Sequence, residues 1–196
     1  MDRVLLKSFS KVNIGLKIIN KRADGYHNIH TVFQEIDFHD NITLRKRNSG
    51  CRFRSNVDWL SNNESNLCVK AWKYLAERFD IAGIDIKLQK NIPPGSGLGG
   101  GSSNAACVLR GLSQIYNLNI SLNNLLEIGT TIGADVPFFI RGGCQIGSGI
   151  GNQLVKVDYP IKNIFLLVMP KIHISTKDVF KKFKKFLDNS QEKVNF

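Results

Sequence analysis

The chain has 196 residues, of which 42% are hydrophobic, and a formal net charge of +11. This length allows one sizeable domain, or one domain and part of a second. No apolar run reaches the roughly eighteen residues of a membrane span, and the N-terminus lacks the apolar core of a secretory signal. We therefore expect a cytoplasmic protein without a membrane partner.

The positive charge is compatible with three interpretations: a nucleic-acid surface, a field that attracts phosphorylated small molecules, or a lysine-rich surface without a partner. The basic residues are scattered except for KKFKK at 181–185, which lies in a predicted amphipathic helix. No RNA-binding signature is present, so we expect no nucleic-acid partner. The four cysteines are widely spaced and form no zinc motif, which predicts reduced thiols.

The first third of the chain predicts two long strands. Residues 4–19 read as extended, and 30–47 are again mainly strand-like. Between them, 21–28 contains Asp24-Gly25, a turn signal that favours a hairpin.

A helix and a strand follow. Residues 65–79 carry apolar side chains at helical spacing, whereas 83–92 alternates as a strand does. Pro93 and Pro94 end that strand, because proline cannot donate to a sheet hydrogen bond.

The remaining elements do not alternate regularly between strand and helix. Residues 121–133 predict a helix with Ser121 as its N-cap, 163–170 predict a strand, and 175–188 predict a helix. This irregular order favours an α+β fold over a doubly wound sheet.

The segment NIPPGSGLGGGSSNAA at 91–106 needs a special explanation. It lies between the predicted strand 83–92 and an amphipathic helix predicted over 102–118, for which Ser102, Ser103 or Asn104 is the expected cap. A GxGxxG pattern occurs, but the acidic residue of a dinucleotide fold is missing. A Walker A lysine and the HRD and DFG motifs of protein kinases are also missing.

A plain flexible turn does not explain this segment, since one glycine suffices for a turn and each further glycine costs backbone entropy. Strand, glycine-rich loop and helix N-terminus together direct backbone N–H groups at an anion. The helix dipole adds about half a positive charge at that end. The segment therefore predicts a phosphate-binding loop.

Five segments together resemble the GHMP kinases (galacto-, homoserine, mevalonate and phosphomevalonate kinases). These are PPGSGLGGGSSNAA at 93–106, SKVNIGLKI at 10–18, KRADGYHNIHTVFQ at 21–34, GADVPFF at 133–139 and GSGIGNQL at 147–154. They are most similar to the branch that phosphorylates the 2-hydroxyl of 4-diphosphocytidyl-2-C-methyl-D-erythritol in non-mevalonate isoprenoid synthesis.

The resemblance implies a GHMP kinase fold of two parts. Residues 1–160 are expected to form an N-terminal domain like ribosomal protein S5 domain 2, and 161–196 the incomplete beginning of a ferredoxin-like C-terminal domain. It implies ATP as phosphoryl donor, Mg²⁺ carried with the nucleotide, and a small-molecule substrate with a cytidine diphosphate group. A monomer or a homodimer is expected.

The resemblance also assigns residues to the site. Lys11 and Asp135 are the expected catalytic pair, and Asn13, Tyr26, His27 and Phe180 the expected substrate contacts. The nucleotide is expected on the glycine-rich segment: Pro93, Pro94, Gly95, Ser96, Gly97, Leu98, Gly99, Gly100, Gly101, Ser102 and Ser103. No residue is assigned to bind a metal directly.

Each of these residues has a plainer interpretation. Asp135 is also a typical helix cap or turn residue, and Lys11 a typical edge-strand charge. Tyr26 and His27 can be surface residues of a hairpin, and Phe180 can be helix core.

Two features depart from the family pattern. Asn152 replaces an acidic residue, and no third glycine-rich segment follows residue 170. A sibling kinase for another small alcohol, or a nucleotide-binding fragment without catalysis, therefore remain alternatives.

Overall fold

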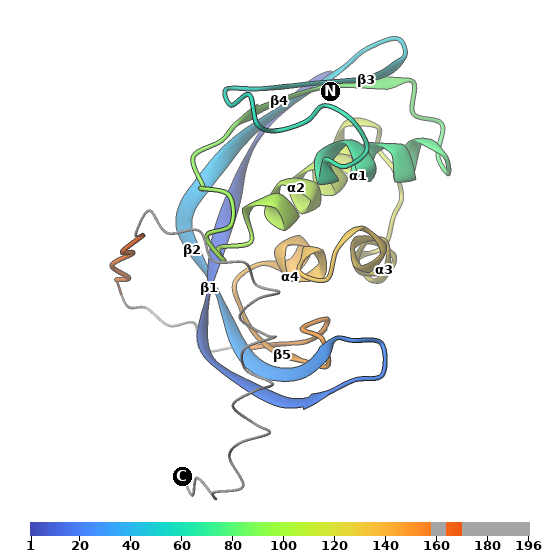
Figure 1. Ribbon diagram of the computed structural model, residues 1–196. Coiled ribbons are helices and arrows are strands. Elements are labelled where there is room, and N and C mark those ends of the chain that lie inside the picture. The colour runs from blue at the N-terminus through green and yellow to red at the C-terminus, as the bar shows by residue number, and fades with distance from the viewer. Residues whose placement is uncertain (158–163, 170–196) are drawn as a thin grey trace, which may run out of the picture.

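The computed structural model describes residues 1–157 and 164–169, which contain a six-stranded sheet with four helices gathered on one side (Figure 1). The strands and helices are, in chain order, β1 (Arg3–Lys21), β2 (His27–Lys46), β3 (Gly50–Ser55), α1 (Leu67–Ala76), β4 (Gly83–Gln89), α2 (Gly100–Ile115), α3 (Leu122–Ile132), α4 (Val136–Arg141), β5 (Cys144–Ser148) and β6 (Gln153–Lys156).

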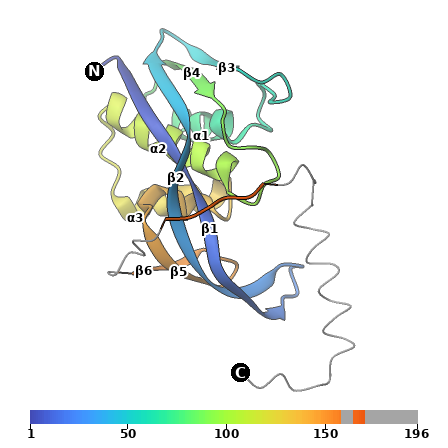
Figure 2. The ribbon, with the colours of Figure 1, turned by 90° about the vertical axis from the view of Figure 1, so that its left-hand side faces the viewer.

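The long strand β2 lies at the centre of the sheet. One edge of β2 pairs with β1. Its other edge pairs with β5 in the first half of the strand and with β4 in the second half, and all three pairings are antiparallel. At one end of the sheet β3 pairs with β4 in parallel, and at the other end β6 pairs with β5 in antiparallel. Three irregularities interrupt the β1–β2 register, and such bulges bend a strand. The β1–β2 ribbon accordingly curves around the helices (Figure 1, Figure 2).

The helix α2 packs directly on the sheet and forms the centre of the core. Its apolar face is buried, with Val108, Leu109 and Leu112 fully inaccessible. Gly111 brings the helix close to the sheet, because a Cβ atom there would lie 2.4 Å from Leu44 Cδ1 and 2.8 Å from Leu6 Cδ1. The position of the helix start, at Gly100, is thereby fixed relative to β1 and β2.

The sequence predicted most of this architecture. The α+β class is confirmed, as are the two long strands with their turn and the helices α1, α2 and α3. The strand predicted over 83–92 is present but ends at Gln89, and α4 was not predicted. Ser121 caps α3 as expected, accepting a hydrogen bond from Asn124 N at 3.2 Å.

Two predictions about local structure are wrong. Residues 164–169 of the expected strand 163–170 are irregular and mostly exposed. The expected side-chain cap of α2 is also missing: the N-cap is Gly99, in the left-handed conformation, and no side chain caps the helix.

The expected boundary at 160, the helix over 175–188 and Phe180 lie outside the described residues. Of the second domain expected over 161–196, only 164–169 is described. Among the helices of the described part, none is both long and apolar enough to cross a membrane.

Candidate active site

One cavity of about 1260 Å³ brings together the segments that the sequence singled out. Its walls come from β1, from the β1–β2 turn, from the glycine-rich loop, from the start of α2 and from the residue before α4. The β1–β2 turn lies at the opposite end of the molecule from α1 (Figure 1). The cavity therefore offers separate ends for two ligands.

The glycine-rich loop is attached to β1 at a predicted catalytic residue. Lys11 N donates to Leu98 O at 3.1 Å. Gly95, Gly97 and Gly99 all have positive φ angles of 65–73°, a conformation that glycine adopts without strain. The loop is thus a defined turn that leads directly into α2.

The N-terminus of α2 has the properties of an anion site. Its first internal hydrogen bond runs from Ser103 N to Gly99 O at 2.9 Å, so the preceding N–H groups of Gly100, Gly101 and Ser102 have no partner within the helix. These three residues line the cavity, and no side chain caps the helix. Free N–H groups and the helix dipole together favour a phosphate here.

Ser103 and Leu98 do not line the cavity, in contrast to the rest of the predicted nucleotide segment. Ser103 is 2% exposed, and its hydroxyl donates to Phe9 O and accepts from Ser8 Oγ at 2.7 Å. The Ser103 hydroxyl therefore connects α2 to β1 and does not face the cavity. Leu98 contributes the carbonyl that binds Lys11 N, while its side chain is buried.

Lys11 lies on β1, an edge strand of the described sheet, but it is a buried cavity residue and not an exposed edge charge. Its side chain is held by Asn13, since Nζ donates to Asn13 Oδ1 at 2.6 Å. Asn13 Nδ2 donates to Thr31 Oγ1 at 2.9 Å, and that hydroxyl donates to Gly15 O at 2.7 Å. This chain of hydrogen bonds fixes the direction in which the ammonium group points. Thr31, which the sequence analysis missed, is part of it.

Asp135 lies at the turn before α4 and lines the same cavity as Lys11. Although it occupies the N-cap position, its side chain makes no capping hydrogen bond. The turn lies beside the start of α2, because a Cβ atom on Gly133 would be 3.9 Å from Ser102 Oγ. Asp135 therefore lines the cavity from a turn beside the start of α2, and its carboxylate is not used as a cap.

The two predicted catalytic residues act on each other electrostatically. Burial lowers the pKa of Lys11 below its usual value, and the negative charge of Asp135 raises it, as the smaller of the two effects. Since the ammonium is costly to keep charged in this place, the neighbouring carboxylate favours its charged form. A carboxylate and an ammonium beside an anion site can accept a proton and stabilise developing negative charge.

Two predicted substrate residues, Tyr26 and His27, lie at the hairpin end of the cavity. Tyr26 is 59% exposed and lines the cavity together with His27 and Asn13. An aromatic ring that is accessible from a cavity can stack on a flat ligand.

The residues that line the other end of the cavity could not be predicted from the sequence. Trp59, Leu60 and Asn66, just before α1, and Leu67, its first residue, line the cavity together with Lys90. Trp59 is 53% exposed. The only sequence feature that pointed to this part of the cavity was a tryptophan between two turn signals. Because Trp59 is far from the glycine-rich loop in sequence, nothing local indicated that the two lie in one cavity.

Gly99 can be tested for its role in shaping the loop. Replacing it with Ala introduces a side chain at φ 71°, and the new Cβ would lie 2.6 Å from the Phe139 ring. We expect Gly99→Ala to lower the free energy of unfolding by about 2–4 kcal/mol, from backbone strain and overpacking combined. Chemical denaturation measures this change.

Gly97→Ala is the matched control, because its φ of 73° is close to the 71° of Gly99 but no atom lies within 4 Å of the added Cβ. The free energy of unfolding of this variant should fall by only about 1–2 kcal/mol, from backbone strain alone. Equal losses in the two variants would show that contact with Phe139 does not matter.

Comparisons with known proteins agree with this geometry. A family described as GHMP kinases N terminal domain matches residues 66–143. A protein of Alkaliphilus oremlandii named 4-diphosphocytidyl-2-C-methyl-D-erythritol kinase is 45% identical over 183 residues, covering 92% of this chain and 63% of the relative. A protein of Persephonella marina with the same name is 42% identical, covering 91% of this chain and 65% of the relative.

A solved structure titled as a 4-(cytidine 5'-diphospho)-2C-methyl-D-erythritol kinase superposes with a TM-score of 0.70 at 35% identity, covering 80% of this chain and 56% of that one. The chain thus spans 63–65% of the length of these two curated relatives. The matched residues contain the glycine-rich loop, α2 and Asp135. By sequence similarity, fold and site, this chain is similar to the GHMP kinases, and its residues 66–143 match their N-terminal domain.

Proposed function

We propose that this chain transfers the γ-phosphoryl group of ATP to the 2-hydroxyl of 4-diphosphocytidyl-2-C-methyl-D-erythritol. The observation that carries the proposal is that Lys11 and Asp135 line one cavity with the uncapped N-terminus of α2. Phosphoryl transfer needs a held polyphosphate, a positioned hydroxyl and charge stabilisation, and these groups supply all three. The names of the two relatives indicate the substrate.

The nucleotide would lie along the glycine-rich loop. Its phosphates meet the N–H groups of Gly100, Gly101 and Ser102, and the wall with Trp59 and Asn66 offers a place for the nucleoside. A Mg²⁺ ion carried with the phosphates would be held largely by them and by waters. Because the cavity presents oxygen donors from Asp135 and Ser102, its chemistry suits a hard cation.

Asp135 accepts the proton of the attacking hydroxyl, and the oxygen then forms its bond to the γ-phosphorus as the bond to the ADP oxygen breaks. Lys11 stabilises the negative charge that develops on the oxygens at this stage. The Asn13–Thr31 hydrogen bonds hold the ammonium in place, so little reorganisation accompanies the reaction.

The cytidine end is assigned to the β1–β2 turn. Tyr26 presents an exposed ring to the cavity, and His27 lies beside it, where a ring nitrogen can bind the edge of a base.

The four cysteines are free, and three of them are buried, as suits a reducing compartment such as the cytoplasm.

The direct test is turnover. The purified chain, incubated with ATP, Mg²⁺ and the diphosphocytidyl substrate, should form ADP and a product with a new phosphomonoester signal in ³¹P NMR. Binding of ATP without any product would support the nucleotide-binding alternative and overturn the proposed reaction.

Tyr26→Ala tests the assignment of the cytidine end. Stacking on a base is worth about 1–3 kcal/mol, so KM for the diphosphocytidyl substrate should rise about 5- to 150-fold. KM for ATP should stay the same, because the nucleotide lies at the other end of the cavity. Steady-state kinetics with each substrate varied in turn measures both.

Tyr74→Ala provides the control, since Tyr74, on α1, stacks with Arg78 just after that helix and does not line the cavity. A substrate whose KM is unaffected by Tyr26→Ala would favour a sibling kinase that acts on another small alcohol.

A further inference from the structure

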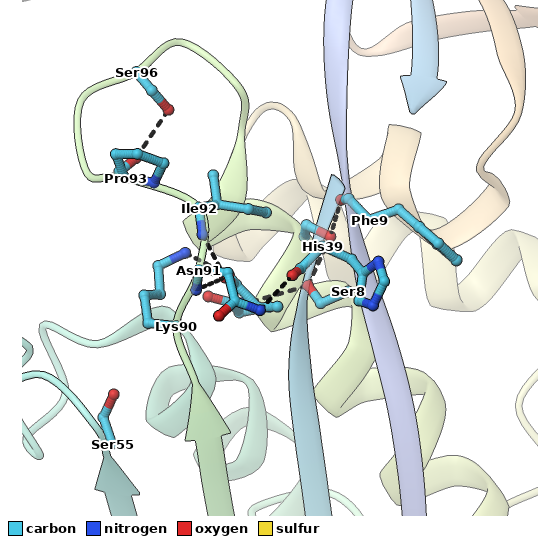
Figure 3. A network of polar contacts seen from close by, with 12 residues as sticks. Ser8, Phe9, His39, Ser55, Lys90, Asn91, Ile92, Pro93 and Ser96 are labelled. Atoms are coloured by element: carbon cyan, nitrogen blue, oxygen red, sulfur yellow. Dashed lines mark hydrogen bonds and ion pairs between the residues drawn. The ribbon is translucent and has the colours of Figure 1, made fainter. Parts of the chain in front are cut away.

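A buried carboxylate that the proposed reaction does not use lies behind the glycine-rich loop. Asp40, on β2, is 0% exposed. Its Oδ1 accepts from Asn91 N at 2.6 Å and from Ile92 N at 2.8 Å. Its Oδ2 accepts from Asn104 Nδ2 at 2.8 Å and forms an ion pair with Lys90 Nζ. Four donors therefore converge on this one side chain. Figure 3 shows the part of this network that lies around Lys90, Asn91 and Ile92.

These donors come from both ends of the glycine-rich loop. Lys90, Asn91 and Ile92 directly precede Pro93, where the loop begins, and Asn104 lies in α2, after the loop ends. Asn104 Nδ2 also contacts Ser8 Oγ at 2.9 Å, which connects this network to β1. One carboxylate thus fixes the distance between the two ends of the loop.

The network also borders the anion site. The Lys90 ammonium lies against the start of α2, because a Cβ atom on Gly100 would be 2.8 Å from Lys90 Nζ. An alanine at residue 100 would therefore displace Lys90. The close approach shows that the position of the helix start and that of the ion pair depend on each other.

Stability alone is a weak reason for such an arrangement. Burying two charges costs desolvation energy, and apolar residues of similar size are often as stable or more stable in their place. A carboxylate, however, can accept several hydrogen bonds at defined angles from two segments at once. That property is needed where backbone groups must be held in one geometry before a ligand binds.

We infer that Asp40 is a positioning residue of the nucleotide site. It holds both ends of the glycine-rich loop so that the N–H groups of Gly100 to Ser102 face the cavity before the polyphosphate arrives. This inference rests on the proposed function, in which that loop receives the phosphates of ATP.

Asp40→Asn tests the inference, because it keeps the size of the side chain and places an NH₂ group where an oxygen accepted hydrogen bonds. Hydrogen bonds to charged groups are worth about 1.5–3 kcal/mol, so the Kd for β,γ-imido-ATP should rise about 10- to 150-fold. The Kd for CDP, a probe of the Tyr26 end, should remain within about twofold. Calorimetry with each probe measures the two constants.

Tyr116→Phe is the matched control. The Tyr116 hydroxyl bonds to Gly83 at the opposite end of β4, so its loss weakens the same strand without touching the loop. It should change neither constant. If Asp40→Asn raised the Kd values for β,γ-imido-ATP and for CDP by the same factor, Asp40 would have a general structural role, and the inference would be overturned.

Hydrogen exchange on the unmodified chain gives a second test, which decides the matter even where the variant does not fold. The amide hydrogens of Asn91 and Ile92 should be protected before any nucleotide is added. Exchange as rapid as in an open loop, slowed only by nucleotide, would contradict the inference. If the unmodified chain does not bind β,γ-imido-ATP, the proposed function fails; if it binds and Asp40→Asn binds equally well, only the role of Asp40 fails.

Discussion

Asp135→Asn should lower the rate of phosphoryl transfer by about 10²- to 10⁴-fold, the usual contribution of a general base. The amide has almost the same shape, but it cannot take the proton of the attacking hydroxyl. Since the Asp135 side chain makes no capping hydrogen bond for α4, the substitution should leave the fold intact. Single-turnover measurements of product formation at saturating ATP isolate this step.

The same variant should also change the titration of Lys11. The negative charge of Asp135 raises the pKa of Lys11 against the larger lowering caused by burial. Removing that charge should therefore move the Lys11 titration to lower pH, which NMR of labelled lysine detects. Asp58→Asn, the same chemical change on an exposed residue outside the main cavity, should affect neither the rate nor this titration.

Lys11→Met should reduce kcat by about 10²- to 10³-fold, the usual cost of removing one group that stabilises negative charge in the transition state. The same substitution should not lower the stability of the fold. Because burial lowers the pKa of Lys11, the folded state disfavours the charged side chain, and that cost is present at neutral pH and below. Methionine removes the buried charge at a similar volume, so the melting temperature should stay the same or rise.

Lys87→Met is a suitable control, since Lys87 lies on β4 with its side chain exposed. It should change neither kcat nor the melting temperature. Lys11→Arg should not restore activity, because the planar guanidinium is larger and cannot place a compact charge where the ammonium lies. A Lys11→Met protein that unfolds at lower temperature while keeping its kcat would contradict the assigned role.

The elements with a regular apolar pattern could be predicted from the sequence. In β4, Ile84, Ile86 and Leu88 alternate, and all three are at most 1% exposed. In α2, the helical spacing likewise identified the buried face. Such patterns are local, so they remain readable without knowledge of the partner elements.

Elements that depend on their partners were missed or wrong. β3, with the sequence GCRFRS, is short and mostly polar, and only its pairing with β4 makes it a strand. The segment 164–169 is apolar enough for a strand, but it is irregular and mostly exposed. A strand needs a neighbour for its backbone groups, and no sequence pattern supplies one.

The candidate site was predictable where a motif carried it, and not where distant residues meet. Lys11, Asp135 and the glycine-rich loop were found from their segments, and the structure brings them to one cavity. The expected cap at Ser103 was wrong because β1 engages that hydroxyl. The contact of Asp40 with Asn104 joins residues 64 positions apart, so nothing local in the sequence indicated it.

The central claim is that the N-terminus of α2 receives the polyphosphate opposite Lys11 and Asp135. A crystal structure of the chain with β,γ-imido-ATP tests it most directly. We expect phosphate oxygens about 3 Å from the N–H groups of Gly100, Gly101 and Ser102, with the terminal phosphate toward Lys11 and Asp135. Phosphates bound away from this helix start, or a terminal phosphate directed away from Asp135, would contradict the account.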